Sequence, residues 1–252
     1  MGFGRRYQYS LFKPGRRKNS VIRKIVKYFF IAFILYELIT GLLIFTLNIE
    51  SNSMTPLMQK NNRLFIFKPA YPQGIFNNAF KLPGIGQPKR GDIVIYHQNF
   101  EKAYPWYLGY VNSLINFFTF QKKELKTKYD YNSRINVGRI AGIPGDTIKI
   151  KNNIAHIKPE KSDNFVTEFE LTKNKYNINI SSFPENWDSK NNPFYSENSD
   201  NYEIKIADGC YFIMGDNRAL YFDSRSSGLI PAQSIKGKVV LRYWPFKQIN
   251  VF

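Results

Sequence analysis

The hydrophobic positions of this 252-residue chain form one long continuous run followed by many short runs. The long run covers residues 28–49, where fourteen side chains are Leu, Ile or Phe. As a helix it would be about 33 Å long at about 1.5 Å per residue, enough to cross a hydrocarbon core of about 30 Å. The pattern therefore predicts a single transmembrane helix over 28–49, with Glu37 as an acidic residue within it.

After residue 50 the apolar runs are short, rich in β-branched and aromatic residues, and separated by Gly, Pro and Asn. Runs of this kind are typical of strands joined by turns. Little helical periodicity accompanies them, so we expect residues 50–252 to form one mainly β domain. The sequence shows no internal repeat and no coiled-coil pattern. The expected strand regions are 63–68, 90–96, 135–150 with a turn in its middle, 203–214 and 236–244.

Two stretches interrupt this pattern and are predicted to be loop-rich insertions. Residues 97–134 contain an apolar, aromatic part at 103–120, but Pro, Gly and Asn break it. It makes a poor second membrane span, and we expect it to pack on the core or rest on a membrane. Residues 152–205 are rich in Asn, Ser, Lys and Glu, which is typical of exposed loops.

The formal charge of +17 is unevenly distributed. Residues 1–27 contain nine Lys or Arg and no acid, which leaves +8 for the remainder of the chain. A basic flank marks the cytoplasmic side of a membrane helix, so residues 1–27 are predicted to be a cytoplasmic segment and 50–252 to be extracytoplasmic. A nucleic-acid-binding arm and a cleaved signal peptide are alternatives. The first is disfavoured because the arm directly adjoins the apolar run, and the second because that run is long and no A-x-A-like site follows it.

Cysteine and histidine are too scarce for several kinds of site. The single Cys210 excludes an intramolecular disulfide framework, and the two histidines, His97 and His156, match no metal-ligand spacing. We therefore expect no metal and no cofactor.

A short stretch directly after the apolar run, Ser51-Asn52-Ser53-Met54-Thr55-Pro56, is the candidate for chemistry. A serine there would face bonds that also lie at a membrane surface. Serine is a weak nucleophile until a base takes its proton. Neither histidine has a motif-like context, which disfavours a Ser-His-Asp triad. A lysine kept neutral by burial is the alternative base.

Four blocks make the chain resemble the bacterial type I signal peptidases, which are membrane-anchored serine proteases. Each block is weak alone, but their order and spacing behind an apolar anchor are specific. They are Ser51–Pro56 (S-x-S-M-x-P), Arg90-Gly91-Asp92-Ile93-Val94 (R-G-D-I/V-V), Arg139 to Asp146 (K-R-x-x-G-x-P-G-D without its lysine), and Gly215-Asp216-Asn217-Arg218 with Asp223-Ser224-Arg225 (G-D-N-R…D-S-R). Residues 97–134 and 152–205 fall outside the blocks.

The resemblance implies a signal-peptidase-like β domain at the outer face of a bacterial cytoplasmic membrane, cleaving signal peptides from secreted preproteins after small residues. It also implies roles for eight positions. Ser53 matches the nucleophile, and the Ser51 hydroxyl with the Ser53 N–H matches the oxyanion hole. Arg139 is expected to pair with Asp216, and Asp223 with Arg225, in support of the site. Ile49 and Val137 match positions that line the pocket for small substrate residues.

The family's general base is missing. The lysine that precedes the arginine of the third block is replaced by Gly138, and the serine that orients this lysine is replaced by Tyr221. A relocated base is one explanation, for which the candidates are Lys68, Lys149, Lys151 and Tyr221. Replacing Gly138 by Lys together with Tyr221 by Ser is the corresponding test.

Other interpretations remain open. The chain is also compatible with a non-catalytic homologue that binds preproteins or assists an active paralogue, with a scaffold unrelated to peptides, and with a site that a partner's lysine completes. A relative of the self-cleaving repressors is disfavoured because no helix-turn-helix pattern occurs. The expected partners are signal peptides and membrane lipid, with the secretion translocon or an active signal peptidase paralogue as further partners, and not nucleic acid.

Overall fold

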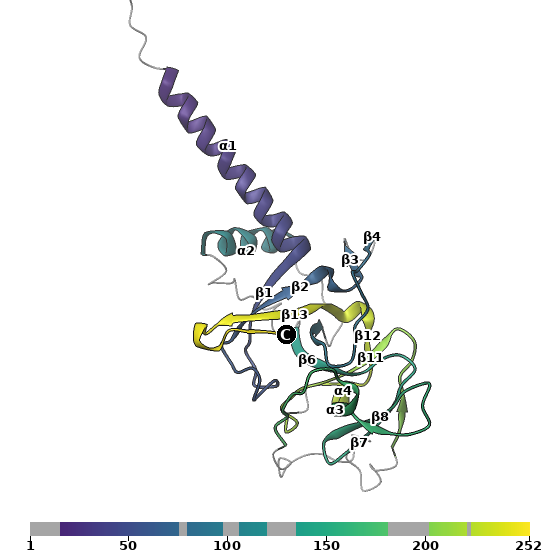
Figure 1. Ribbon diagram of the computed structural model, residues 1–252. Helices are drawn as coiled ribbons and strands as arrows, with labels where there is room; N and C mark the ends of the chain where they lie inside the picture. The colour runs from purple at the N-terminus through teal and green to yellow at the C-terminus, as the bar shows by residue number, and fades with distance from the viewer. Residues whose placement is uncertain (1–15, 76–79, 98–105, 120–134, 181–201, 221–222) are drawn as a thin grey trace, which may run out of the picture.

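A computed structural model describes residues 16–75, 80–97, 106–119, 135–180, 202–220 and 223–252. Strands are the main regular elements of the domain that follows the N-terminal helix (Figure 1). The helices are α1 (Arg16–Leu38), α2 (Trp106–Thr119), α3 (Glu168–Leu171) and α4 (Ser224–Ser227), with a π-helix at Ile39–Leu43 and 3₁₀ turns at Lys68–Ala70, Ala232–Ser234 and Phe246–Gln248. The strands are β1 (Ile44–Asn48), β2 (Arg63–Phe67), β3 (Gln73–Ile75), β4 (Phe80–Leu82), β5 (Ile93–His97), β6 (Ile135–Gly142), β7 (Thr147–Lys151), β8 (Ile154–Lys158), β9 (Val166–Thr167), β10 (Ile204–Lys205), β11 (Cys210–Met214), β12 (Ile230–Pro231), β13 (Ile235–Trp244) and β14 (Asn250–Val251).

The prediction of one helix over residues 28–49 is wrong at both ends. The helix begins at Arg16, inside the basic segment, and helical structure ends at Leu43. The last part of the apolar run is strand β1, which pairs with β2 from Ile44 opposite Phe67 to Asn48 opposite Arg63. The apolar side chains of Phe45 and Leu47 on this strand pack against the domain core. In the described part of the chain, no helix combines the length and the apolar character that a membrane crossing requires.

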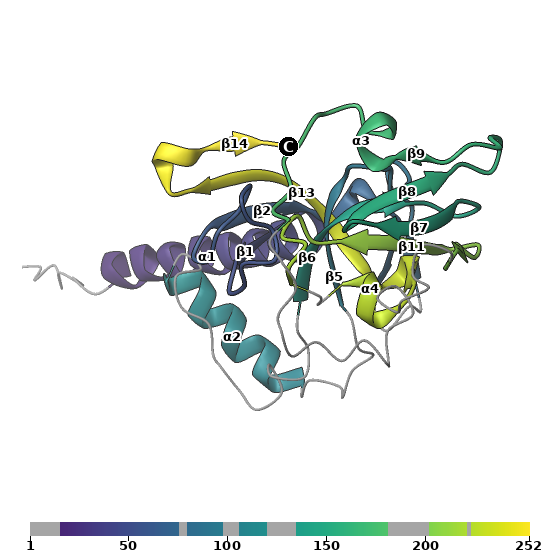
Figure 2. The same ribbon diagram turned by 90° about the horizontal axis from the view of Figure 1, so that it is seen from below.

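The predicted strand regions are confirmed, and they form one large sheet and one small sheet. The large sheet has eight strands in the order β1-β2-β13-β5-β6-β11-β12, with β14 beside β13. The small sheet has the order β10-β7-β8-β9, and β3 and β4 form a separate pair. Figure 2 shows the small sheet and α3 on the side of the large sheet away from α1. Strands β6 and β11 are neighbours in the large sheet. The third sequence block begins on β6, and the fourth block directly follows β11.

Three groups of buried apolar side chains hold these sheets together. The first lies under the loop between β1 and β2 and includes Ile49, Met54 and Met58. The second joins the large sheet to the small sheet through Ile148, Ile150 and Met214, and the third covers the opposite face of β5 and β6. Alternation along β2 and β7 places every second residue in these cores, as period-2 patterning requires.

Helix α2 lies in the first predicted insertion and packs against α1. The Phe117 ring lies edge-on to the rings of Phe33 and Tyr36, with centroids 5.3 and 5.1 Å apart. Figure 1 shows α2 beside the domain-proximal end of α1. The remaining residues of the two insertions at 98–105, 120–134 and 181–201, and also residues 1–15 and Tyr221, lie outside the described residues.

Candidate functional site

The two candidate serines lie next to each other in the loop between β1 and β2. The hydroxyl oxygens of Ser51 and Ser53 are 3.0 Å apart, and the Ser53 backbone N–H points toward the Ser51 hydroxyl at a distance of 3.5 Å. Ser51 is exposed and Ser53 is half-buried. Both hydroxyls are therefore within reach of a group that enters from solvent.

This loop is fixed to the fourth sequence block through its backbone. Asn217 donates its backbone N–H to the Ser53 carbonyl at 2.9 Å and its side-chain N–H to the Asn52 carbonyl at 3.2 Å. Gly215 makes this close approach possible, because a Cβ atom there would lie 2.6 Å from the Ser53 carbonyl oxygen. On the other side, the fully buried Met54 side chain anchors the loop in the core.

Arg139 and Asp216 form the expected ion pair, and it is buried. Two guanidinium N–H groups of Arg139 donate to the two carboxylate oxygens of Asp216 at 2.8 and 2.7 Å. The Asp216 side chain has no exposed surface and that of Arg139 is 7% exposed. A third N–H of Arg139 donates to the Gly91 carbonyl at 3.0 Å, so one guanidinium joins the second, third and fourth sequence blocks.

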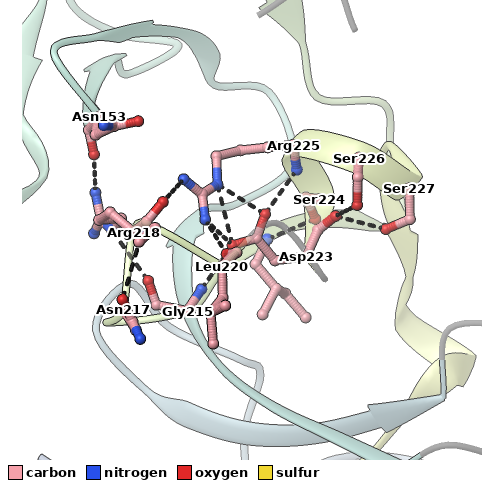
Figure 3. A network of polar contacts seen from close by, with 12 residues as sticks. Asn153, Gly215, Asn217, Arg218, Leu220, Asp223, Ser224, Arg225, Ser226 and Ser227 are labelled. Atoms are coloured by element: carbon pink, nitrogen blue, oxygen red, sulfur yellow. Dashed lines mark hydrogen bonds and ion pairs between the residues drawn. The ribbon is translucent and has the colours of Figure 1, made fainter. Parts of the chain in front are cut away.

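Asp223 and Arg225 also pair, and Figure 3 shows how they hold the Gly215–Arg218 stretch. The Arg225 guanidinium donates to Asp223 at 2.9 and 2.7 Å, and to the Arg218 carbonyl at 2.8 Å. Asp223 also accepts the backbone N–H of Gly215 at 2.9 Å. Each member of the pair therefore fixes a different end of the segment that carries Asp216 and Asn217.

The structure adds an ion pair that the sequence analysis missed, between Arg218 and Glu168. Two guanidinium N–H groups of Arg218 donate to the two carboxylate oxygens of Glu168, each at 2.6 Å, and both side chains are 1% exposed. Burial alone would raise the pKa of Glu168, but the Arg218 charge and the hydrogen bonds from Arg218, Tyr176 and Ala155 hold it below its ordinary value. Glu168 lies in the 152–205 insertion, so part of that insertion belongs to the frame of the site.

Tyr176 connects this pair to the Arg139 pair. Its hydroxyl donates to Glu168 at 2.6 Å, and its ring faces the Arg139 guanidinium with the charge 3.9 Å from the ring centroid. Nearby, the backbone of Asn179 exchanges hydrogen bonds of 2.9 Å with Asp216 and Arg218. No sequence signal pointed to the Arg218–Glu168 pair, because Glu168 lies outside the four blocks.

Gly138, at the position of the missing lysine, has no room for a side chain. It lies on β6 opposite Val94. A Cβ atom added there would lie 2.6 Å from the Ile213 Cγ2 atom, 3.2 Å from the Tyr96 ring and 3.3 Å from the Met214 carbonyl oxygen.

Burial raises the pKa of the Tyr96 hydroxyl far above its usual value, and the nearby Asp223 charge adds to the shift. Tyr96 thus stays protonated at neutral pH and is unsuited to act as a base there.

None of the lysines considered as relocated bases has a position suited to the role. Lys149 and Lys151 alternate along β7 with the buried Ile148 and Ile150, so they lie on the outer face of the small sheet. Lys149 rests over the Phe165 ring at 4.1 Å.

Lys68 has the lowered pKa expected of a lysine base, but its amine is bound at the other end of β1 from Ser53. Burial lowers the pKa of its amine. However, its Nζ donates to the Thr40 carbonyl at 3.0 Å, before the start of β1, whereas Ser53 follows the end of β1. The four residue steps of this strand alone separate the two ends by about 14 Å. In the part of the chain that the structure describes, no lysine, histidine or carboxylate side chain hydrogen-bonds to Ser53.

Ile49 and Val137 are both buried and belong to one apolar group beneath the serine loop. Val137 lies on β6 next to Gly138, and Ile49 directly follows β1. The structure therefore brings the two positions together on one side of the loop.

Among the described residues no group of three or more His, Cys, Asp or Glu side chains could hold a metal ion.

Comparisons with known proteins identify the family to which these blocks belong. The family model for signal peptidase, peptidase S26, matches residues 22–244, which includes both insertions. A signal peptidase I of Bacillus caldolyticus is 29% identical over 200 residues, covering 79% of each chain. A signal peptidase I of Bacillus licheniformis is 26% identical over 240 residues, covering 94% of this chain and 96% of the relative.

A crystal structure of a signal peptidase I from Enterococcus faecalis V583 also matches, with 18% identity and a TM-score of 0.31. The match covers 62% of this chain and 98% of that chain. A TM-score this low does not support a detailed structural argument, so the family assignment depends on the match between sequences.

Proposed function

The chain belongs to the signal peptidase S26 family, and we propose that it is a membrane-bound serine endopeptidase that removes signal peptides from secreted preproteins, with Ser53 as its nucleophile. The observation that carries this proposal is the pair of hydroxyls 3.0 Å apart on Ser51 and Ser53, in a loop whose backbone is fixed by Asn217. A nucleophile and an oxyanion donor need such fixed proximity. The signal peptidase I relatives support the reaction class.

In the proposed reaction the Ser53 Oγ attacks the scissile carbonyl carbon and loses its proton to a base. The negative charge that develops on the carbonyl oxygen is stabilised by the Ser51 hydroxyl and the Ser53 backbone N–H, which in the present structure face each other. The leaving amine takes a proton as the peptide bond breaks, and an acyl-enzyme remains on Ser53. Water then attacks this ester, returns the proton to Ser53 and releases the signal peptide.

Ile49 and Val137 are proposed to limit the substrate to small residues before the scissile bond, since both are apolar and lie together beside the loop. The buried pairs Arg139–Asp216 and Asp223–Arg225 are proposed to keep the Gly215–Arg218 stretch, and through it Ser53, in place.

The location is part of the same proposal. Many apolar side chains of α1 are exposed, among them Phe30 at 58% and Ile34 at 55%, and the basic N-terminal segment precedes them. Exposed apolar surface on this scale is typical of contact with lipid or a partner. We propose that α1 is embedded in the bacterial cytoplasmic membrane with its N-terminus in the cytoplasm, and that the translocon or an active paralogue delivers preproteins to the outer face.

A second function, binding of preproteins without cleavage, is favoured by one observation. The space beyond Gly138 is filled by Ile213 and Tyr96, so the site lacks a base there and cannot gain one by a single substitution. In this alternative the two serines bind the peptide carbonyl, and the protein assists an active signal peptidase.

The test is a cleavage assay with the full chain in detergent and a model preprotein that has an A-x-A site. Wild type and Ser53→Ala are compared by gel, with an active homologue as a positive control. Cleavage by wild type that is lost in Ser53→Ala supports the endopeptidase. Cleavage retained in Ser53→Ala would remove Ser53 from the nucleophile role.

If the homologue cleaves and wild type does not, the non-catalytic function is favoured. Fluorescence anisotropy with a labelled signal peptide then measures binding. Ser51→Ala and Ser53→Ala should weaken that binding if the serines hold the peptide carbonyl. Lys149→Gln, on the outer face of the small sheet, is the matched control.

A further inference from the structure

A cavity of about 750 Å³ lies against the C-terminal strand pair, and neither Ser51 nor Ser53 lines it. Its walls come from five places: the turn that precedes β5, the loop at Pro56 and Leu57, Arg139 on β6, the end of the chain from β13 to Phe252, and the segment 173–177 that follows α3. In Figure 2 this segment runs beside the C-terminus of the chain. The volume lies within the range of about 300–1,000 Å³ that is usual for small-molecule sites.

The cavity wall is strongly basic. Seven of its residues are Lys or Arg, and one, Asp92, is acidic. Three of the seven cations are neutralised by buried or half-buried carboxylates, through the pairs Arg90–Asp146, Arg139–Asp216 and Lys238–Asp92. Four cations remain in excess.

One of these four is held in place without a carboxylate partner. Arg242 donates to the Leu57 and Gln248 carbonyls and, at 3.5 Å, to the Asn62 side chain. Burial lowers the pKa of its guanidinium, because the charged form is partly removed from water with no anion beside it. An arginine fixed by carbonyls has few N–H groups to reorganise when an anion binds.

The other three are Lys89, Lys173 and Lys175, whose exposed side chains form no ion pair with any residue that the structure describes. They line the same cavity from two segments that are far apart in the sequence, one lysine on the turn before β5 and two on the segment after α3. Like charges around one cavity repel each other, and the repulsion falls when an anion enters between them. Lysine ammonium groups, as compact charges, suit phosphate oxygens.

We propose that this cavity binds a soluble anion with several phosphate groups, an oligophosphate of about three phosphates, whose charge matches the surplus of lysines and Arg242. The site is independent of the serine chemistry, since no described contact to Ser53 involves its cationic residues. Its lining includes Arg139 and Tyr176, which hold Asp216 and Glu168. The cavity exists only in the folded protein, so a bound anion stabilises that state by mass action.

The experiment uses the full chain in detergent and sodium tripolyphosphate as the probe, with calorimetric titration and thermal unfolding as the two readouts. Sodium chloride at the same ionic strength controls for screening. The test variant is Lys89→Gln with Lys173→Gln and Lys175→Gln. Its control is Lys151→Gln with Lys161→Gln and Lys205→Gln, three exposed lysines associated with the small sheet.

We expect saturable binding to wild type and to the control variant, with an upward shift in Tm that chloride does not produce. The test variant should bind about tenfold more weakly, because each exposed charge contact contributes about 0.2–1 kcal/mol. All the replaced lysines are exposed, so both variants should fold like wild type. Absence of binding, or equal weakening in both variants, would overturn the proposal.

A final arm separates two sources of phosphate. Monomeric dihexanoyl phosphatidic acid is added to the tripolyphosphate complex below its micelle concentration. Retention of tripolyphosphate would support the soluble oligophosphate. Displacement would assign the site to a lipid headgroup and would overturn the proposed soluble ligand.

Discussion

The guanidinium of Arg218 and the carboxylate of Glu168 meet in the protein interior through two hydrogen bonds of 2.6 Å. Fifty residues separate them in the sequence, and they join the stretch that holds Ser53 to an insertion that the sequence patterns left unexplained. The Tyr176 hydroxyl and the Ala155 N–H complete the carboxylate's partners. Because the pair is fully buried, removing one member leaves the other charge without compensation.

This relationship predicts a large loss of stability in Glu168→Gln. The neutral amide leaves the Arg218 charge buried and unpaired, so the free energy of unfolding should fall by about 3–5 kcal/mol. Urea unfolding followed by circular dichroism measures the change. Glu203→Gln, at an exposed position, is the matched control and should stay within about 0.5 kcal/mol of wild type. A loss of similar size in both variants would contradict the role of the pair.

The same carboxylate predicts a pH dependence. The pKa of Glu168 in the folded protein lies below its ordinary value of 4.5, so its ion pair stabilises the protein fully above pH 4.5. That contribution is lost as the pH falls from 4.5 through the folded pKa, because the unfolded chain binds the proton first. Urea unfolding from pH 7 to pH 3 should therefore show the gap between wild type and Glu168→Gln shrinking below pH 4.5. A gap that is constant or widens would contradict the prediction.

Gly138→Ala should destabilise the protein by about 1–3 kcal/mol through overpacking, since the added methyl group meets the Ile213 side chain at 2.6 Å. Gly86→Ala, whose nearest contact would be 3.9 Å, is the control and should be nearly neutral. The double variant Gly138→Ala with Ile213→Ala should lose less unfolding free energy than the two single variants lose together. The difference should be about 0.5–3 kcal/mol. Strict additivity in urea unfolding would show that the two positions do not compete for space.

The contacts around Gly138 also predict what happens to cleavage activity when a lysine is restored at that position. Gly138→Lys with Tyr221→Ser should give no gain in preprotein cleavage, because the lysine stem still meets Ile213 and Tyr96. Adding Ile213→Ala opens room for the stem, and a gain in cleavage is expected only in that triple variant. The gel assay with an A-x-A preprotein measures both, and circular dichroism confirms that each variant is folded. A gain in the double variant would show that the space at residue 138 opens more easily than its contacts imply.

Ser51→Ala should lower kcat for preprotein cleavage by about 10²–10³ and change KM little, because its hydroxyl stabilises charge that exists only in the transition state. Ser162→Ala, in a loop of the 152–205 insertion, is the control and should leave both constants unchanged. Ser53→Ala provides the background rate. A rise in KM with unchanged kcat would assign Ser51 to substrate binding instead.

The sequence by itself determined the main strands and the family. Period-2 alternation and turn residues placed the strands that include Arg63–Phe67 and Ile235–Trp244, because a strand must face the core with every second residue. The four blocks, through the family that they resemble, predicted Ser53 as the nucleophile and predicted the Arg139–Asp216 pair that the structure shows, since each of these residues lies within a block.

Only the tertiary structure decided what the apolar run and the insertion do. An apolar residue satisfies a lipid environment and a protein core equally well, so hydropathy could not show that Ile44–Asn48 pairs with β2. The partner of Arg218 and the space at Gly138 also depend on strands that meet only after folding. Contacts between distant segments are set by three-dimensional packing, and local sequence patterns carry no information on which acid or which methyl group fills a given site.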